Sequence, residues 1–394
     1  MTQKAISAVV GLGFSELSRK PIGTTRELAA DAVRAAVIDS GLDKSEIDGL
    51  LLNRSPLALF EDLPLELQDD LGLYDLRLLN SVEAEGSSAV QMLQQASMAI
   101  SHGMANAVVC VFSDAPLAPV DGGGGGDAFA LHMPLTGIEG WEQRYGFTGA
   151  TGGYAMAAQR HMSLYGTTSE HLGAYAIACR DWAALNDRAF LRKPLSMEDY
   201  LASRLIVEPF RMFDCCYPVN GAAAVVVTRC DKARDCATNP VYIHGMGQGH
   251  AGMPGLAGFD RETTSGAKLA GQGAYQTAGI TAKDVTACQF YDAFSYVGLV
   301  SLEDYGFCEP GEGGPFIADG NISPGGSLPV NTGGGQLSGY YLQGMTPISE
   351  AVIQGRGDGG ARQVDNNDVI LVSGNGGRLQ YHAALIMSPM ETLS

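Results

Sequence analysis

The sequence predicts an α/β protein made of two similar lobes that pack with pseudo-twofold symmetry. The main observation is a repeat: LAADAVRAAVIDSGLDKSEIDGLLL, beginning at Leu28, resembles AKLAGQGAYQTAGITAKDVTACQFY, beginning at Ala267. Each copy has an Ala-rich helical pattern, a glycine suited to a C-terminal cap, a polar turn and a short apolar run typical of a buried strand. The length of 394 residues also exceeds one small core. We therefore expect two halves, residues 1–235 and 236–394.

Matching strands flank the two copies of the repeat. AISAVVGLGFSE at Ala5 and PVYIHGMGQGHA at Pro240 both indicate a strand ahead of the repeated helix. ANAVVCVFSD and NNDVILVSGNGG close the two halves, each after another helix. The order strand, helix, strand, helix, strand therefore occurs twice, which is typical of two related α/β units.

An inserted region interrupts the repeat at about residues 115–205. Its run of five glycines, which begins at Gly122, can form no regular element, so we expect a mobile loop that covers a site or builds a dimer contact. The segment from Tyr154 to Tyr165 is expected to be helical. A core strand from Ala222 to Thr228 then brings the chain back to the first lobe.

Composition narrows the classes of partner. A formal charge of −18 disfavours nucleic acid and anionic membranes, and no apolar run of about 18 residues or signal peptide is found, so a cytoplasmic protein is expected. Only 17% of residues are charged, which suggests extensive burial or an oligomer interface. The eight cysteines form no CxxC pair, so we expect small core hydrophobes and no metal site.

Three stretches resemble motifs of the thiolase superfamily. PFRMFDCCYPVNGAAAVVV is similar to the thiolase segment ending in Asp-Gly-Ala-Ala-Ala, with Asn220 replacing the acid. YDAF, beginning at Tyr291, stands where thiolases carry Asn-Glu-Ala-Phe. NTGGGQLSGYYLQG resembles the loop Asn-Pro-Ser-Gly-Gly that runs on to Gly-His-Pro. The resemblance covers nearly the whole chain and implies a thiolase-like fold with two duplicated lobes in a five-layer arrangement.

The same resemblance implies that the Cys-His-Cys chemistry of thiolases is absent. The position of the nucleophilic cysteine falls on Gly86, that of the histidine on Tyr341, and that of the acid/base cysteine on Ser373 or Gly374. Within the superfamily this combination resembles the lipid-transfer-protein-type aldolases. That resemblance implies a lyase that cleaves the side chain of a steroid-CoA or similar thioester by a retro-aldol step.

A retro-aldol site needs a base, an acid and an oxyanion hole. Tyr291 and Tyr341 are the leading acid/base candidates, with Tyr296 third and Asp292 in a supporting role. The thioester is expected to approach the substrate loops at Gly86, Asn331, Gly334, Gly374 and Asn375. No cofactor is expected, since coenzyme A belongs to the substrate.

Two other functions stay open at this point. An acyltransferase could use an unrecognised nucleophile such as Ser87, Ser88 or Cys308, although the two serines suit helix N-caps better. A non-catalytic subunit of thiolase fold is the other alternative. His244 and His382 are expected to be hydrogen-bonded core residues. The resemblance also implies a homodimer and a small partner protein with an OB fold and a zinc ribbon, which could contribute part of the contact with the CoA phosphates.

Overall fold

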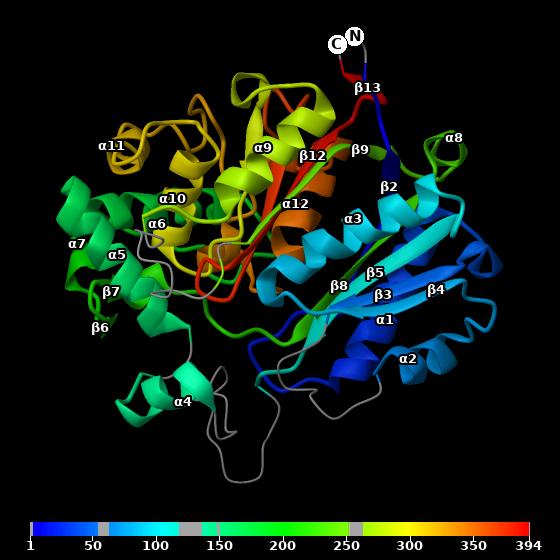
Figure 1. Ribbon diagram of the computed structural model, residues 1–394, viewed down its shortest axis with the longest axis horizontal. Coiled ribbons are helices and arrows are strands. Elements are labelled where there is room, and N and C mark those ends of the chain that lie inside the picture. The colour runs from blue at the N-terminus through cyan, green and yellow to red at the C-terminus, as the bar shows by residue number, and fades with distance from the viewer. Residues whose placement is uncertain are drawn as a thin grey trace.

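A nine-stranded mixed sheet with helices on its faces dominates the computed structural model (Figure 1), which describes residues 3–53, 63–117, 136–147, 150–250, 252 and 263–393. The strand order is β10-β11-β12-β9-β2-β8-β5-β3-β4. The strands are β2 Ser7–Phe14, β3 Gly49–Asn53, β4 Leu78–Val82, β5 Ala107–Asp114, β8 Gly221–Thr228, β9 Val241–His250, β10 Ala287–Gln289, β11 Ile370–Gly376 and β12 Tyr381–Ser388.

The two halves of the chain meet edge to edge in this sheet. Strand β2 pairs antiparallel with β9, from Ser7 opposite Ile243 to Val9 opposite Val241. Moving outward from this junction, the order is β2-β8-β5-β3 on one side and β9-β12-β11-β10 on the other. The same order of equivalent strands therefore repeats around the junction.

Four helices complete a five-layer arrangement. Helix α1 (Thr25–Ser40) packs on β2, β8 and β5, and α9 (Ala267–Ala278) packs on β9 and β12. Helices α3 (Ser88–Ser101) and α12 (Met345–Arg356) contact each other and strands from both halves, so they form the central layer. The predicted thiolase-like α/β fold with duplicated lobes is confirmed.

The repeated helices end as the sequence predicts. Gly41 after α1 and Gly279 after α9 both adopt the left-handed conformation, with φ of 72° and 68°, which a residue without Cβ enters at little cost. At the other end of α1, Thr24 and Glu27 form a capping box. Each repeated helix is thus delimited by its own local sequence.

The inserted region contributes four helices beside the C-terminal half (Figure 1). They are α4 Gly137–Arg144, α5 Thr151–Tyr165, α6 Ser169–Ala184 and α7 Met197–Ala202. Helix α5 confirms the helix predicted from Tyr154 to Tyr165. The five-glycine run lies outside the described residues.

Smaller elements complete the chain. Strands β1 (Gln3–Lys4) and β13 (Thr392–Leu393) pair beside the two termini, and β6 (Leu205–Val207) pairs with β7 (Phe210–Arg211). The remaining helices are α2 Leu63–Leu71, α8 Cys230–Ala233, α10 Ser295–Asp304 and α11 Gly313–Ala318.

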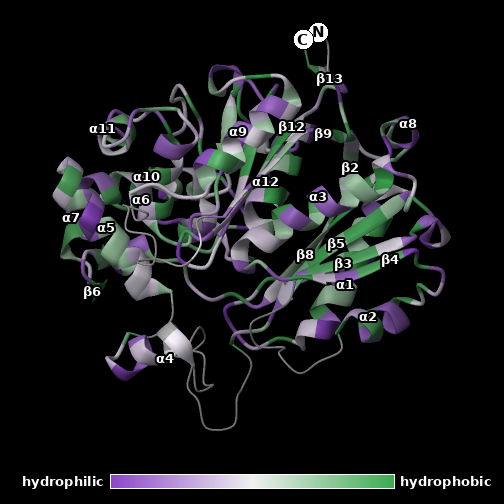
Figure 2. Ribbon diagram, in the orientation of Figure 1, coloured by the Kyte–Doolittle hydropathy of each residue, from purple (hydrophilic) through white to green (hydrophobic). Residues whose placement is uncertain are grey.

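Hydrophobic residues concentrate on the strands, as the colours of β3, β5 and β8 in Figure 2 show. All eight residues of β5 and all eight of β8 are buried, which explains the apolar runs 107–112 and 222–227 within them. Within the described part of the chain, no helix combines the length and apolar composition needed to cross a membrane.

Candidate active site

The structure brings the two leading tyrosines into direct contact. The hydroxyl oxygens of Tyr291 and Tyr341 lie 3.0 Å apart, and their rings meet edge to face with centroids 6.4 Å apart. Tyr291 lies on the short connection between β10 and α10, whereas Tyr341 lies between the π-turn Gly335–Gly339 and α12. Residues 50 positions apart in the chain thus form one hydrogen-bonded pair of phenols.

Gly86 lies directly against this pair. A Cβ atom built on Gly86 would lie only 2.2 Å from Cε2 of Tyr291 and 2.3 Å from the backbone oxygen of Asn375. Gly86 belongs to the 3₁₀ turn Glu85–Ser87, which leads into α3. The Tyr291 ring therefore occupies the space that any side chain at position 86 would need.

Burial raises the pKa of both phenols well above the usual value, and each hydroxyl also feels the other. Both tyrosines are consequently neutral across the physiological pH range. One hydroxyl donates to the other, which leaves the acceptor with a hydrogen of its own. The pair therefore carries no net charge and still has one hydrogen that can be donated to a third group.

The glycine-rich loop is fixed through Asn331. This residue has a φ of 52°, and its side-chain oxygen accepts a 2.6 Å hydrogen bond from the backbone N–H of Phe290 while its amide nitrogen donates to the Tyr175 hydroxyl at 3.0 Å. Gly334 packs against Ala183 of α6, where a Cβ would lie 2.6 Å away. The structure thus uses Asn331 and Gly334 to hold the loop, and neither contacts the tyrosine pair through a described hydrogen bond.

Asp292 supports the same loop from inside the protein. Its carboxylate accepts hydrogen bonds from the backbone N–H of Gln336 at 2.7 Å, from the Tyr175 hydroxyl at 3.4 Å and from the Cys179 thiol at 3.5 Å. Loss of water around the fully buried group raises its pKa to about 7, against the lowering effect of these donors. Near pH 7 Asp292 is therefore partly protonated, and its hydrogen bond to Gln336 N–H holds the backbone of the glycine-rich loop in place.

This pKa predicts how stability depends on pH. The unfolded chain loses the Asp292 proton near pH 3.8, whereas the folded protein keeps it until about pH 7, so the group costs stability as the pH rises between these values. The variant Asp292→Asn lacks this cost. We expect its free energy of unfolding, relative to that of the unmodified protein, to rise by up to about 1.4 kcal/mol per pH unit between pH 4 and 7, and to level off above.

Urea unfolding at four pH values from 5 to 8 measures this difference. The exposed Asp187, paired with Arg192 at the surface, provides the control, because Asp187→Asn should give a difference that does not change over this range. A difference for Asp292→Asn that is flat between pH 5 and 7 would contradict the assigned pKa.

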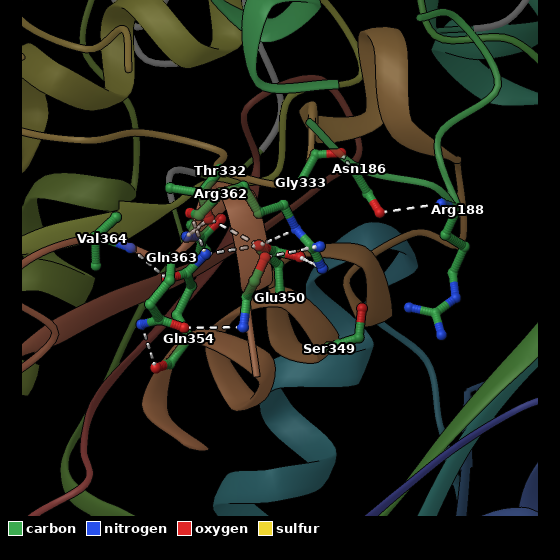
Figure 3. A network of polar contacts seen from close by, with 12 residues as sticks. Asn186, Arg188, Thr332, Gly333, Ser349, Glu350, Gln354, Arg362, Gln363 and Val364 are labelled. Carbon is green, nitrogen blue, oxygen red and sulfur yellow. Dashed lines mark hydrogen bonds and ion pairs between the residues drawn. The ribbon is translucent and has the colours of Figure 1, made fainter. Parts of the chain in front are cut away.

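A buried polar network anchors the loop to α12 (Figure 3). Glu350 of α12 forms an ion pair with Arg362, with Nε to Oε1 at 3.0 Å, and accepts a hydrogen bond from the Thr332 hydroxyl at 2.9 Å. Gln354 donates to the same carboxylate at 3.0 Å. Gly333 passes so close that a Cβ there would lie 2.7 Å from Oε2 of Glu350. The glycines thus bring the loop backbone onto this carboxylate.

Neutralising Glu350 should therefore be costly. Glu350→Gln keeps the volume but leaves the buried Arg362 guanidinium without its counter-ion, which costs about 3–5 kcal/mol. Urea unfolding at pH 7 measures the loss, and Asp187→Asn again serves as the exposed ion-pair control with little expected effect. Equal losses in the two variants would show that the network contributes no more than a surface pair.

The structure offers no activated nucleophile among the residues proposed from the sequence. Ser88 accepts a hydrogen bond from the backbone N–H of Ala84 at 2.7 Å, and Ser87 stands at the N-cap of α3 without a side-chain capping bond, so the predicted capping role of these hydroxyls is wrong. Burial raises the pKa of every one of the eight thiols, Cys308 to about 12. No thiolate is favoured near neutral pH.

The remaining candidates lie elsewhere. Tyr296 is fully buried on α10, with its ring 5.5 Å from that of His161. Cys308 lines a cavity of about 800 Å³ together with Lys268 and Asp304, and neither Tyr291 nor Tyr341 lines that cavity. His244 bonds to the Met390 carbonyl at 2.7 Å, as expected of a core residue.

Sequence reasoning missed Tyr154 of α5. Its hydroxyl donates to the Gly377 carbonyl at 2.7 Å and accepts from the Asn375 side chain at 3.1 Å. Electrostatic interaction with Tyr154 also contributes to the raised pKa of both Tyr291 and Tyr341. Gly374 and Asn375 lie on β11 next to the turn of Gly86: a Cβ on Gly374 would lie 3.0 Å from Cα of Ser87. The hydroxyls of Tyr154, Tyr291 and Tyr341 therefore lie in the same region as the Gly86 turn and the end of β11.

Comparisons with known proteins identify the family of this chain. A family model described as thiolase C-terminal domain-like matches residues 245–389. A steroid side-chain-cleaving aldolase of Thermomonospora curvata is 34% identical over 94% of this chain and 95% of the relative. A 17-hydroxy-3-oxo-4-pregnene-20-carboxyl-CoA lyase of Mycobacterium tuberculosis is 33% identical over 94% of this chain and 96% of the relative. The solved structure of an Ltp2-ChsH2(DUF35) aldolase superimposes with a TM-score of 0.87 at 33% identity, covering 98% of both chains.

Proposed function

Because this chain belongs to the thiolase superfamily, and within it to the family of the steroid side-chain-cleaving aldolases, we propose that it is a carbon–carbon lyase acting on a β-hydroxyacyl-CoA. The products are a ketone or aldehyde and a shortened acyl-CoA. The acyl group is a steroid side chain or a similarly bulky group, as the names of the two relatives suggest.

One observation supports the mechanism: two neutral phenols, at positions that the resemblance aligns with polar groups of the thiolase site, share a hydrogen bond. A single phenol with a raised pKa is a poor base, but a hydrogen-bonded pair avoids that difficulty. As one phenol takes the proton from the β-hydroxyl, it passes its own proton to its neighbour. In the same step the neighbour gives its own proton to the α-carbon, so that neither phenol is ever doubly protonated.

This relay balances all atoms without a covalent intermediate. The O–H bond and the Cα–Cβ bond of the substrate break, a C=O bond forms at the former β-carbon, and the electron pair of Cα–Cβ becomes the enolate of the thioester. The relayed proton then ends on Cα, so both phenols return to their starting state. No external oxidant or cofactor enters the balance.

The enolate oxygen needs stabilisation while it carries negative charge. Gly86 lies in the turn ahead of α3, and the N-cap Ser87 offers no side-chain oxygen to the first turn of that helix. The positive end of the α3 dipole therefore faces the Gly86 turn. We propose that this end of α3 stabilises the oxygen of the thioester carbonyl as negative charge develops on it.

Product analysis tests the function. Incubating the protein with a β-hydroxyacyl-CoA of a steroid side chain should release ketone and shortened acyl-CoA in equal amounts, and the intact mass of the protein should stay unchanged throughout turnover. An acyl adduct on the protein would instead indicate an acyltransferase. The absence of turnover with every thioester tried, including in the presence of a partner protein, would indicate a non-catalytic subunit.

The proposal includes partners. The solved aldolase that this chain resembles is a complex of Ltp2 with ChsH2(DUF35). We propose that this chain also acts with a DUF35 protein, which would be the small OB-fold and zinc-ribbon partner expected from the sequence. We further propose that the complex is cytoplasmic and is built around a homodimer of this chain. With a net charge of −18, the chain is poor in groups for the CoA phosphates. CoA affinity should therefore be higher in the presence of the partner than in its absence.

A further inference from the structure

The side chain of Asn375 is buried next to the tyrosine pair with half of its hydrogen-bonding capacity unused. Asn375 is 2% exposed, and its amide nitrogen donates to the Tyr154 hydroxyl at 3.1 Å. Its amide oxygen, Oδ1, has no hydrogen-bond donor within the described part of the chain. A buried acceptor without a donor costs free energy, so a donor that arrives with a ligand would remove that cost.

Asn375 is held so that this oxygen keeps its direction. The Tyr154 hydroxyl accepts from the Asn375 amide and at the same time donates to the Gly377 carbonyl at 2.7 Å. The N–H of Gly377 in turn donates to the Glu85 carboxylate at 2.8 Å. Because Tyr154 requires the N–H₂ side of the amide, the oxygen cannot exchange places with the nitrogen.

The backbone of Asn375 lies beside the reacting groups, because its carbonyl oxygen is 2.3 Å from a Cβ built on Gly86, next to the Tyr291 ring. In β11, Asn375 and Ser373 point to the same face, and the Ser373 hydroxyl accepts from the backbone N–H of Tyr291 at 3.2 Å. The neighbouring strand provides no donor there: His382, directly opposite Asn375 in β12, has an Nδ1 atom that also lacks a partner in the described residues. His382 is buried, as expected of a core residue, although this ring nitrogen lacks the expected hydrogen bond among the residues that the structure describes.

The chemistry of a β-hydroxyacyl thioester identifies the donor that fits. The β-hydroxyl has one hydrogen, and the proposed relay takes it. The enolate and the ketone have none at the reacting centre. The first remaining donor along the molecule is the amide N–H of the pantetheine arm, two carbon atoms beyond the sulfur.

We infer that Asn375 Oδ1 accepts a hydrogen bond from this amide N–H, and that Tyr154 is the positioning residue that fixes the orientation of the Asn375 amide. This inference rests on the proposed function, because it takes a CoA thioester as the substrate. It assigns the unpartnered oxygen to the thiol arm rather than to the acyl group that is cleaved.

Two small thioesters test the inference. Both carry the same β-hydroxyacyl group; one is the N-acetylcysteamine thioester, which has the N–H, and the other is its acetoxyethyl analogue, in which oxygen replaces N–H. The unmodified protein should cleave the first with kcat/KM about tenfold higher, since the second leaves Oδ1 without a donor. In Asn375→Ala and in the less disruptive Asn375→Leu, the two thioesters should be cleaved at equal rates.

Tyr154→Phe should reduce the preference without abolishing turnover, because the ring stays packed at 4.8 Å from Phe294 while the amide loses its fixed orientation. Tyr275→Phe is the matched control, since this half-buried tyrosine donates its hydroxyl to the Tyr305 carbonyl at 3.0 Å, and the preference of this variant should equal that of the unmodified protein. Equal cleavage of both thioesters by the unmodified protein, or an undiminished preference in both Asn375 variants, would overturn the inference. Failure to cleave either thioester or the CoA ester would instead count against the proposed function.

Discussion

Tyr291→Phe and Tyr341→Phe are each expected to lower kcat for ketone release by about 10²–10⁴-fold, which is the usual contribution of general acid–base catalysis. Both changes keep the buried ring and delete only the hydroxyl that forms the 3.0 Å contact. Either deletion breaks the relay, because the remaining phenol has a raised pKa and cannot serve as a base alone. The KM for the thioester should change much less than kcat.

The double variant distinguishes a relay from two independent groups. If the two phenols act as one unit, Tyr291→Phe/Tyr341→Phe should be about as slow as either single variant, whereas independent roles would multiply the two losses. The adjacent Tyr340 is a matched control: its buried hydroxyl bonds to that of Ser349 at 2.8 Å, so Tyr340→Phe should retain kcat. Normal ketone release by both single variants would end the assignment of the pair.

The fold could be predicted because the sequence patterns that specify its helices and strands are local and occur in both halves of the chain. The Ala-rich helices, their αL glycines at 41 and 279 and the apolar strands that follow all report short-range physics, and each copy supports the other. The edge-to-edge pairing of β2 with β9 has no such signal, since it joins residues more than 230 positions apart. Only the symmetry of the repeat suggests that the halves meet.

The site was predictable in part for a different reason. Tyr291 and Tyr341 stand at motif positions, so the resemblance locates them, although Tyr291 only ends the second copy of the repeat and Tyr341 lies outside it. Tyr154 lies on α5 of the inserted region, where no motif marks it, and only the fold brings its hydroxyl to Asn375. The Asp292 carboxylate could be located next to Tyr291, but its direction, away from the hydroxyl pair and toward Cys179, depends on tertiary packing.

Gly86→Ala is expected to abolish most of the activity although it adds a single methyl group. The added Cβ would overlap both Cε2 of Tyr291 at 2.2 Å and the carbonyl oxygen of Asn375 at 2.3 Å. Backbone on one side and a packed ring on the other leave little room for relief, so the Tyr291 ring must move and the hydroxyl contact must lengthen. We expect kcat to fall to within about tenfold of the value for Tyr291→Phe, with about 1–3 kcal/mol of lost stability.

Gly273→Ala on α9 is the control, because its added Cβ meets only the Cα of Gly247 at 3.1 Å and the Met246 carbonyl at 3.8 Å, away from the pair. Gly86→Cys makes the test sharper, since it restores the thiol that thiolases have at this position. The same overlap applies to its Cβ, so we expect neither aldol cleavage nor an acyl adduct in the intact mass. Acylation of Gly86→Cys with the tyrosine contact intact would contradict this explanation. It would show that substrate, and not the Tyr291 ring, occupies the space over Gly86. If Gly86→Ala and Gly86→Cys are folded but inactive, the result supports the explanation that position 86 must be glycine because the Tyr291 ring fills the space that a side chain there would need.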